Sequence, residues 1–61
     1  MVYQAEIHRK ANSVNVEDRK EAAFSLGRAF AHVPNKEEAW KDLHSLAVDA
    51  DSDVRWSAAE S

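Results

Sequence analysis

The chain has 61 residues and a mass of 6.9 kDa, enough for one small domain and too little for two or for a large enclosed active site. The absence of cysteine excludes disulfides and thiolate metal sites, and a formal net charge of −3 disfavours phosphate-rich partners such as nucleic acid or an acidic membrane surface. The 44% of hydrophobic residues include eleven alanines, and they form no run long enough for a membrane span or a signal peptide. We therefore expect a soluble, cytoplasmic chain, and the single glycine and single proline indicate an all-α fold.

Two helices are predicted in the N-terminal half. Apolar residues at four-residue spacing predict a first helix that ends near Asn12; these are Tyr3, Ile7 and Ala11. Asn15 is a good N-cap for a longer helix over residues 16–32. Its expected core-facing residues are Ala22, Ala23, Leu26, Ala29, Phe30 and Val33.

Pro34 separates the halves, because proline disfavours helical geometry at the residue before it and lacks a backbone donor. Asn35 and Glu38 have the spacing of a capping box, so a third helix is predicted over residues 36–48. Its apolar stripe is Ala39, Trp40, Leu43, Leu46, Ala47 and Ala50. A fourth helix is predicted after an acidic turn over residues 49–53, with Asp51 as its N-cap.

The chain resembles itself at a spacing of 36 residues. Six identical pairs support the repeat: His8 and His44, Ala11 and Ala47, Arg19 and Arg55, Ala22 and Ala58, Ala23 and Ala59, and Ser25 and Ser61. The matches fall on expected helix faces and caps, and the same turn lies between them. The pattern therefore indicates two copies of one helical unit.

Two segments carry a resemblance to a known family. The stretch from Asp49 to Ala59 has an acidic turn, then Val-Arg, then an alanine pair, and residues 15–27 are similar and add Leu-Gly. Both resemble the HEAT-like repeats of phycobilisome-lyase-type proteins, although Asp18 stands where the second copy has Val54. The resemblance implies a short α-solenoid of about four helices, stacked as antiparallel hairpins in a single domain over residues 1–61. We expect this domain to be a fragment of a longer array.

The resemblance also implies a role. HEAT-like repeats favour a non-catalytic protein–protein interaction or scaffold module, with a protein partner or self-association through exposed terminal helices. The alternatives are a bilin-lyase-like protein that holds a tetrapyrrole, and a purely structural segment of a larger repeat protein. In the resembling family an arginine at the positions of Arg19 and Arg55 reaches the acidic turn of a neighbouring repeat, so we expect Arg19 to pair with Asp51 or Asp53.

The acidic turn also matches the opening of an EF-hand. Asp49, Asp51 and Asp53 alternate as calcium ligands do, with Ser57 and Glu60 at the ninth and twelfth positions. The sixth position, however, is valine where the loop needs glycine. We therefore expect an acidic helix start, and whether the turn binds an ion is left open.

The histidines and tryptophans form no pattern that predicts a catalytic site, a metal site or a cofactor. His8 and His44 occupy equivalent repeat positions, without a second ligand at helical spacing, and we interpret them as packing or partner-contact residues. Trp40 extends an apolar stripe and is expected in the core. Trp56 lies off the apolar face of the last helix, which makes it a candidate for contact with a partner or a neighbouring repeat.

Overall fold

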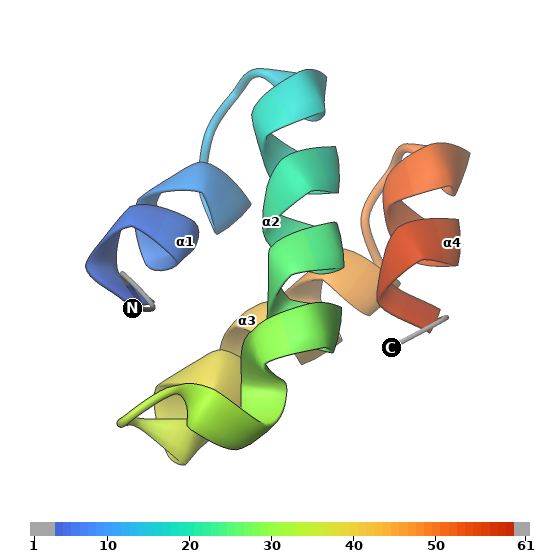
Figure 1. Cartoon of the computed structure of the whole chain (residues 1–61). Coiled ribbons are helices and arrows are strands. Elements are labelled where there is room, and N and C mark those ends of the chain that lie inside the picture. The colour runs from blue at the N-terminus through green and yellow to red at the C-terminus, as the bar shows by residue number, and fades with distance from the viewer. Residues whose placement is uncertain (1–3, 60–61) are drawn as a thin grey trace.

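The computed structural model describes residues 4–59, which form four α-helices with short connections (Figure 1). The helices are α1 (Gln4–Ala11), α2 (Val16–Ala29), α3 (Lys36–Ala47) and α4 (Ser52–Ala59), and a 3-10 turn, η1 (Phe30–His32), continues α2. Residues 4–59 contain no strand, so the predicted all-α class is confirmed. Among these helices none is both long and apolar enough to cross a membrane.

Polar side chains fix where three of the helices begin. Each accepts hydrogen bonds from backbone N–H groups two or three residues ahead, at 2.8–3.1 Å; the three are Asn15 for α2, Asn35 for α3 and Asp51 for α4. The predicted capping box at Asn35 is only half formed, because the Asn35 N–H donates to Gln4 Oε1 at 2.9 Å and not to Glu38. A residue distant in sequence thus replaces the local partner.

The proline boundary lies where the sequence predicts it. Val33 has extended backbone angles (φ −73°, ψ 141°) immediately before Pro34, as the proline ring requires. The helix that starts at Val16 reaches His32, as expected, but its last three residues tighten into η1.

The core is built from small and medium apolar residues of all four helices and of the segment before Pro34. Its buried members are Ala11, Ala22, Ala23, Leu26, Val33, Ala39, Leu46, Val54 and Ala58. Ala29 and Phe30, expected in the core, are only half-buried, and Tyr3 lies outside the described residues. The many alanines allow the helices to approach closely, so a chain with few large apolar residues still forms a core.

Trp40 is the main error of the sequence prediction. Its side chain is 59% exposed, and Ala47 and Ala50 are exposed as well. The buried face of α3 instead carries Ala39, Asp42 and Leu46. Trp40 follows Ala39 directly, and one residue turns a helix by about 100°. Trp40 therefore projects away from the core.

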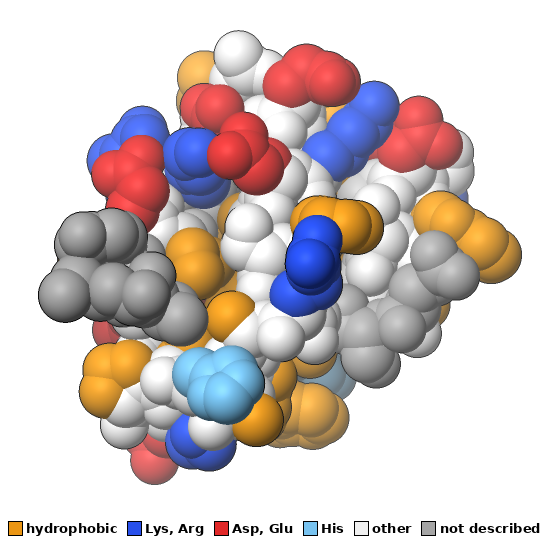
Figure 2. All heavy atoms as spheres, viewed as in Figure 1, with side chains coloured by type: hydrophobic (Ala, Val, Ile, Leu, Met, Phe, Trp, Pro, Cys, Tyr) orange, Lys and Arg blue, Asp and Glu red, His pale blue; other side chains and the backbone are white. Residues whose placement is uncertain are grey.

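Helix α2 lies at the centre of the arrangement and packs against α1 on one side and α4 on the other, while α3 packs mainly against α4 (Figure 1). Helices α2 and α4 begin at the same end of the molecule, where acidic and basic side chains gather (Figure 2, top). The loops that lead into these two helices lie at this charged end.

The two loops repeat the same hydrogen bonds 36 residues apart. The loop before α2 has bonds from Asn12 N to Arg9 O, Ser13 N to Lys10 O, Asn15 N to Ser13 Oγ and Arg19 N to Asn15 O. The loop before α4 has the equivalent bonds from Val48 N to Ser45 O, Asp49 N to Leu46 O, Asp51 N to Asp49 Oδ1 and Arg55 N to Asp51 O. The sequence repeat is therefore also a repeat of local structure.

Candidate functional site

Arg19 joins the two loops at the charged end of the molecule. Its Nε donates to Asp49 Oδ2 at 2.9 Å, and its Nη1 donates to the carbonyls of Ser13 and Val14 at 2.9 and 3.0 Å. The Arg19 and Asp49 side chains are only 20% and 12% exposed, so water screens the ion pair weakly. A backbone hydrogen bond from Asp51 and the pair with Arg19 together hold the pKa of Asp49 below its usual range.

The carboxylate that Arg19 meets differs from the expected one. Asp51, one of the two predicted partners, uses its side chain to cap α4. Asp53, the other, is 73% exposed and lies 3.4 Å from Lys20 Nζ. Arg55 repeats the carbonyl half of the arrangement, because its Nη1 donates to Asp49 O at 2.6 Å and Ala50 O at 3.0 Å. These contacts hold the two loops in place.

The acidic turn has the structure of a helix start. The Asp49 and Asp51 carboxylates are engaged by backbone N–H groups and by Arg19, and none of the residues 4–59 has the positive φ of a sharp glycine turn. Val54, at the position where an EF-hand has glycine, is fully buried. Glu60 lies outside the described residues.

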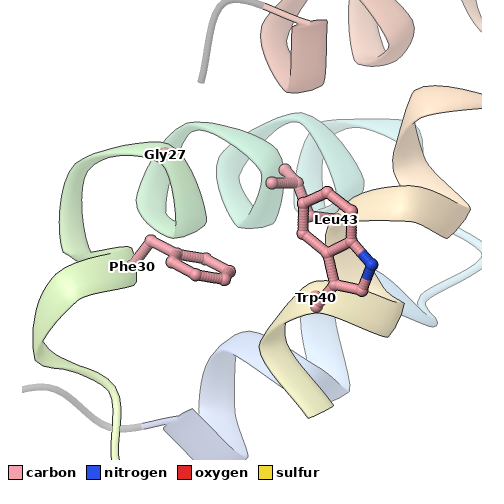
Figure 3. A pocket seen from close by; sticks show the side chains of 4 residues that line it. All are labelled: Gly27, Phe30, Trp40 and Leu43. Carbon is pink, nitrogen blue, oxygen red and sulfur yellow. The ribbon is translucent and has the colours of Figure 1, made fainter. Parts of the chain in front are cut away.

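Trp40 borders two hollows in the surface. The smaller, of about 210 Å³, is lined by Gly27 of α2 and by the side chains of Phe30 from η1 and of Trp40 and Leu43 from α3 (Figure 3). The Phe30 and Trp40 rings meet edge to face, with centroids 6.4 Å apart and planes at 80°. Gly27 has no side chain to fill this space, so the hollow stays open beside an exposed indole.

The larger hollow, of about 360 Å³, lies on the other side of Trp40 and brings it together with a predicted contact residue. Lys41, His44 and Ser45 complete its lining. His44, named from the sequence as a candidate partner contact, therefore lies beside Trp40 on the exposed face of α3. We call the lining of the two hollows the Trp40 surface; it consists of Gly27, Phe30, Trp40, Lys41, Leu43, His44 and Ser45.

The other two candidate contact residues lie on different helices. Trp56 is 65% exposed on α4, as its position off the apolar face predicts. His8 is on α1, where its Nδ1 donates to Asp42 Oδ2 of α3 at 2.8 Å, and this hydrogen bond raises the pKa of His8. His8 is thus an inter-helix polar contact, and Glu38 Oε1 lies 3.8 Å from the same nitrogen.

Several contacts of the candidate site join residues that are distant in sequence, so local spacing could not predict them. Asp42 and Glu38 are 34 and 30 residues from His8 along the chain, so no local motif joins them. Gln4 is likewise buried against Asn35, 31 residues away, and its Nε2 donates to Asn35 O at 2.6 Å. The i, i+4 spacing of Glu38 and Asp42 could have indicated a shared helix face, but not the histidine opposite.

The fold and the Trp40 surface define the class of the protein as small and all-helical, with an exposed aromatic surface. Comparison with known proteins does not narrow this class. Comparison with models of protein families, with curated proteins and with solved structures gives no match.

Proposed function

We propose that the chain is a non-catalytic, HEAT-like repeat module that binds a segment of another protein on the Trp40 surface. The single observation that carries the proposal is the placement of Trp40 on α3, where its side chain is 59% exposed and borders two hollows. A tryptophan buries about 150–250 Å² when covered, so covering the exposed part of Trp40 is worth about 2–4 kcal/mol. Exposed aromatic residues beside a pocket are typical anchors of protein interfaces.

The smaller hollow beside Trp40 suits a single side chain better than a small-molecule ligand. The more enclosed one, at about 210 Å³, is smaller than the roughly 300–1,000 Å³ typical of small-molecule pockets. It can accept one large apolar side chain against the Phe30 and Trp40 rings.

Charge indicates the composition of the partner segment. The residues that line the Trp40 surface include one charged side chain, that of Lys41, and no carboxylate. Complementary charge speeds association and selects partners. The proposed partner is therefore an amphipathic segment with a large apolar anchor residue and an acidic residue beside it that can pair with Lys41.

A peptide-display selection against the immobilised 61-residue chain tests this function. We expect enriched peptides to share an apolar anchor with an acidic residue beside it, and Trp40→Ala to weaken their binding at least about tenfold. Trp56→Ala is the matched control, because it removes an equally exposed indole from a different helix. Failure to enrich any peptide, or an equal effect of the two substitutions, contradicts the proposal.

Gly27 offers a second test in the opposite direction. It lies within α2 without a positive φ, so a larger residue there needs no backbone change. Gly27→Leu fills the small hollow and should abolish peptide binding, whereas Gly27→Ala should raise stability by up to about 1 kcal/mol.

If the enriched peptides compete with dimer formation at the same surface, the occupant is a second copy of the chain and the partner proposal fails.

A further inference from the structure

A histidine and two carboxylates meet between α1 and α3, away from the hollows beside Trp40. His8 Nδ1 lies 2.8 Å from Asp42 Oδ2 and 3.8 Å from Glu38 Oε1, and one donor atom from each residue falls within 4.8 Å of the others. The Asp42 side chain is only 10% exposed, while those of His8 and Glu38 are 48% and 38% exposed. The three donors therefore combine a nearly buried carboxylate with two groups that open to solvent.

We propose that His8, Glu38 and Asp42 bind a divalent transition-metal ion, with Zn²⁺ the best match. Imidazole nitrogen and carboxylate oxygen are both ordinary zinc ligands, and the two carboxylates balance the charge of the ion. Calcium and magnesium prefer shells made only of oxygen, which a histidine does not supply. None of the three donor residues lines the hollows beside Trp40, although Lys41 borders both sites, and the inference does not depend on the proposed protein-binding function.

The spacing of the donors fits such an ion after a small adjustment. Zinc holds nitrogen and oxygen ligands at about 2.0–2.2 Å, so neighbouring donors in a tetrahedral site are about 3.4 Å apart. The His8–Asp42 distance is slightly shorter and the His8–Glu38 distance slightly longer than this value. Zn²⁺ binding therefore requires the half-exposed Glu38 side chain to rotate toward the other two donors.

The surroundings leave room for the ion. A hollow of about 290 Å³ is lined by the three donor residues together with Asn35, Glu37 and Lys41. Lys41 brings a positive charge to this lining, and its Nζ lies 3.7 Å from Glu37 Oε1, where that charge is partly balanced. Three protein donors leave the fourth zinc position for water or for a ligand from another molecule.

Gln4 holds the two helices in the register that the site needs. It lies one turn before His8 on α1, and its amide makes two hydrogen bonds, of 2.6 and 2.9 Å, with the backbone of Asn35 at the start of α3. Because Gln4 is buried, this double contact is protected from water. The donors from α1 and α3 are therefore brought together by a contact other than their own attraction.

Calorimetric titration of the metal-free 61-residue chain with ZnCl₂ tests the proposal. We expect one ion per chain, and at least about tenfold weaker binding by His8→Gln and Asp42→Asn, because loss of even an outer-shell partner costs about 10–100-fold. His44→Gln is the matched control, since His44 is an exposed histidine on α3 outside the cluster. Saturating Zn²⁺, at about 100 times its dissociation constant, should also raise the melting midpoint of the wild-type chain by about 10 °C or more.

A spectrum keeps the test informative if a variant fails to fold. Titration of the ¹⁵N-labelled wild-type chain with Zn²⁺ should shift the backbone signals around His8, Glu38 and Asp42, and leave those at the start of α4, which carries none of the three donors, in place. The proposal is wrong if no heat is released up to millimolar Zn²⁺, if His8→Gln binds as the wild type does, or if His44→Gln loses as much affinity as His8→Gln.

Discussion

Replacement of Arg19 by alanine should destabilise the protein more than replacement of its repeat counterpart, Arg55. Arg19 makes a charge-assisted hydrogen bond to Asp49 at 2.9 Å with both side chains mostly buried, whereas Arg55 is exposed and donates to the backbone carbonyls of Asp49 and Ala50. Hydrogen bonds to charged groups are worth about 1.5–3 kcal/mol, and neutral ones about 1 kcal/mol. The second Arg19–Asp49 contact, at 3.5 Å, adds little.

Both arginines donate to two loop carbonyls, so the ion pair should make Arg19→Ala about 1.5–3 kcal/mol more costly than Arg55→Ala. In a domain of this size 1 kcal/mol moves the melting midpoint by about 4–8 °C, so the midpoint of Arg19→Ala should lie about 6–24 °C below that of Arg55→Ala. The midpoints are measured by circular dichroism at 222 nm.

A double-mutant cycle isolates the ion pair from the carbonyl contacts. Arg19→Met and Asp49→Asn, singly and together, should show a coupling energy of at least about 1 kcal/mol, since the two side chains touch directly. Arg19→Lys should recover only part of the loss, because an ammonium group cannot reach the carboxylate and both carbonyls with fixed planar geometry. Equal losses for Arg19→Ala and Arg55→Ala, or a coupling near zero, would refute the view that this arginine ties the two loops together.

Three further outcomes are expected. Because the pKa of Asp49 is depressed in the folded chain, its contribution is complete above the ordinary aspartate value and is lost as pH falls through the lower folded value. The stability gap between wild type and Asp49→Asn should therefore narrow on acidification below pH 4, and a constant gap across urea titrations from pH 6 to pH 2 contradicts this. Gln4→Ala should cost about 1–3 kcal/mol in urea unfolding, because it leaves the Asn35 backbone groups without their partner; a change below 0.5 kcal/mol is the opposing result. Ala23→Leu should overpack a fully buried site and so lower the folding stability by about 1–3 kcal/mol, which a lower melting midpoint reports. Ala47→Leu, on an exposed face, should leave the midpoint nearly unchanged. Similar midpoints for the two variants would count against close helix packing.

The helix boundaries were predictable because local chemistry determines them. Asn15, Asn35 and Asp51 each satisfy free N–H groups at a helix start, and Pro34 forces an extended residue before it. Such signals act over a few residues, so a single sequence contains them. The all-α class follows from the same local evidence.

The errors arise where residues distant in sequence decide the outcome. Trp40 fits an apolar stripe, yet the buried face of α3 is set partly by Asp42, which turns inward to meet His8 from another helix. For the same reason the cluster of His8, Glu38 and Asp42 was invisible to local spacing. Arg19 was correctly expected to reach the acidic turn, but its partner is Asp49. The Asp51 carboxylate is already engaged as the N-cap of α4.

The two indole N–H signals of the ¹⁵N-labelled chain give the most direct test of the central claim, binding at the Trp40 surface. Assigned by Trp40→Phe and Trp56→Phe, they report separately on α3 and α4. On titration with a peptide from the display selection, we predict that the Trp40 signal and the backbone signals of Gly27 and Leu43 shift together to saturation, while the Trp56 signal stays in place. A saturable shift of Trp56 with Trp40 unmoved would contradict the account.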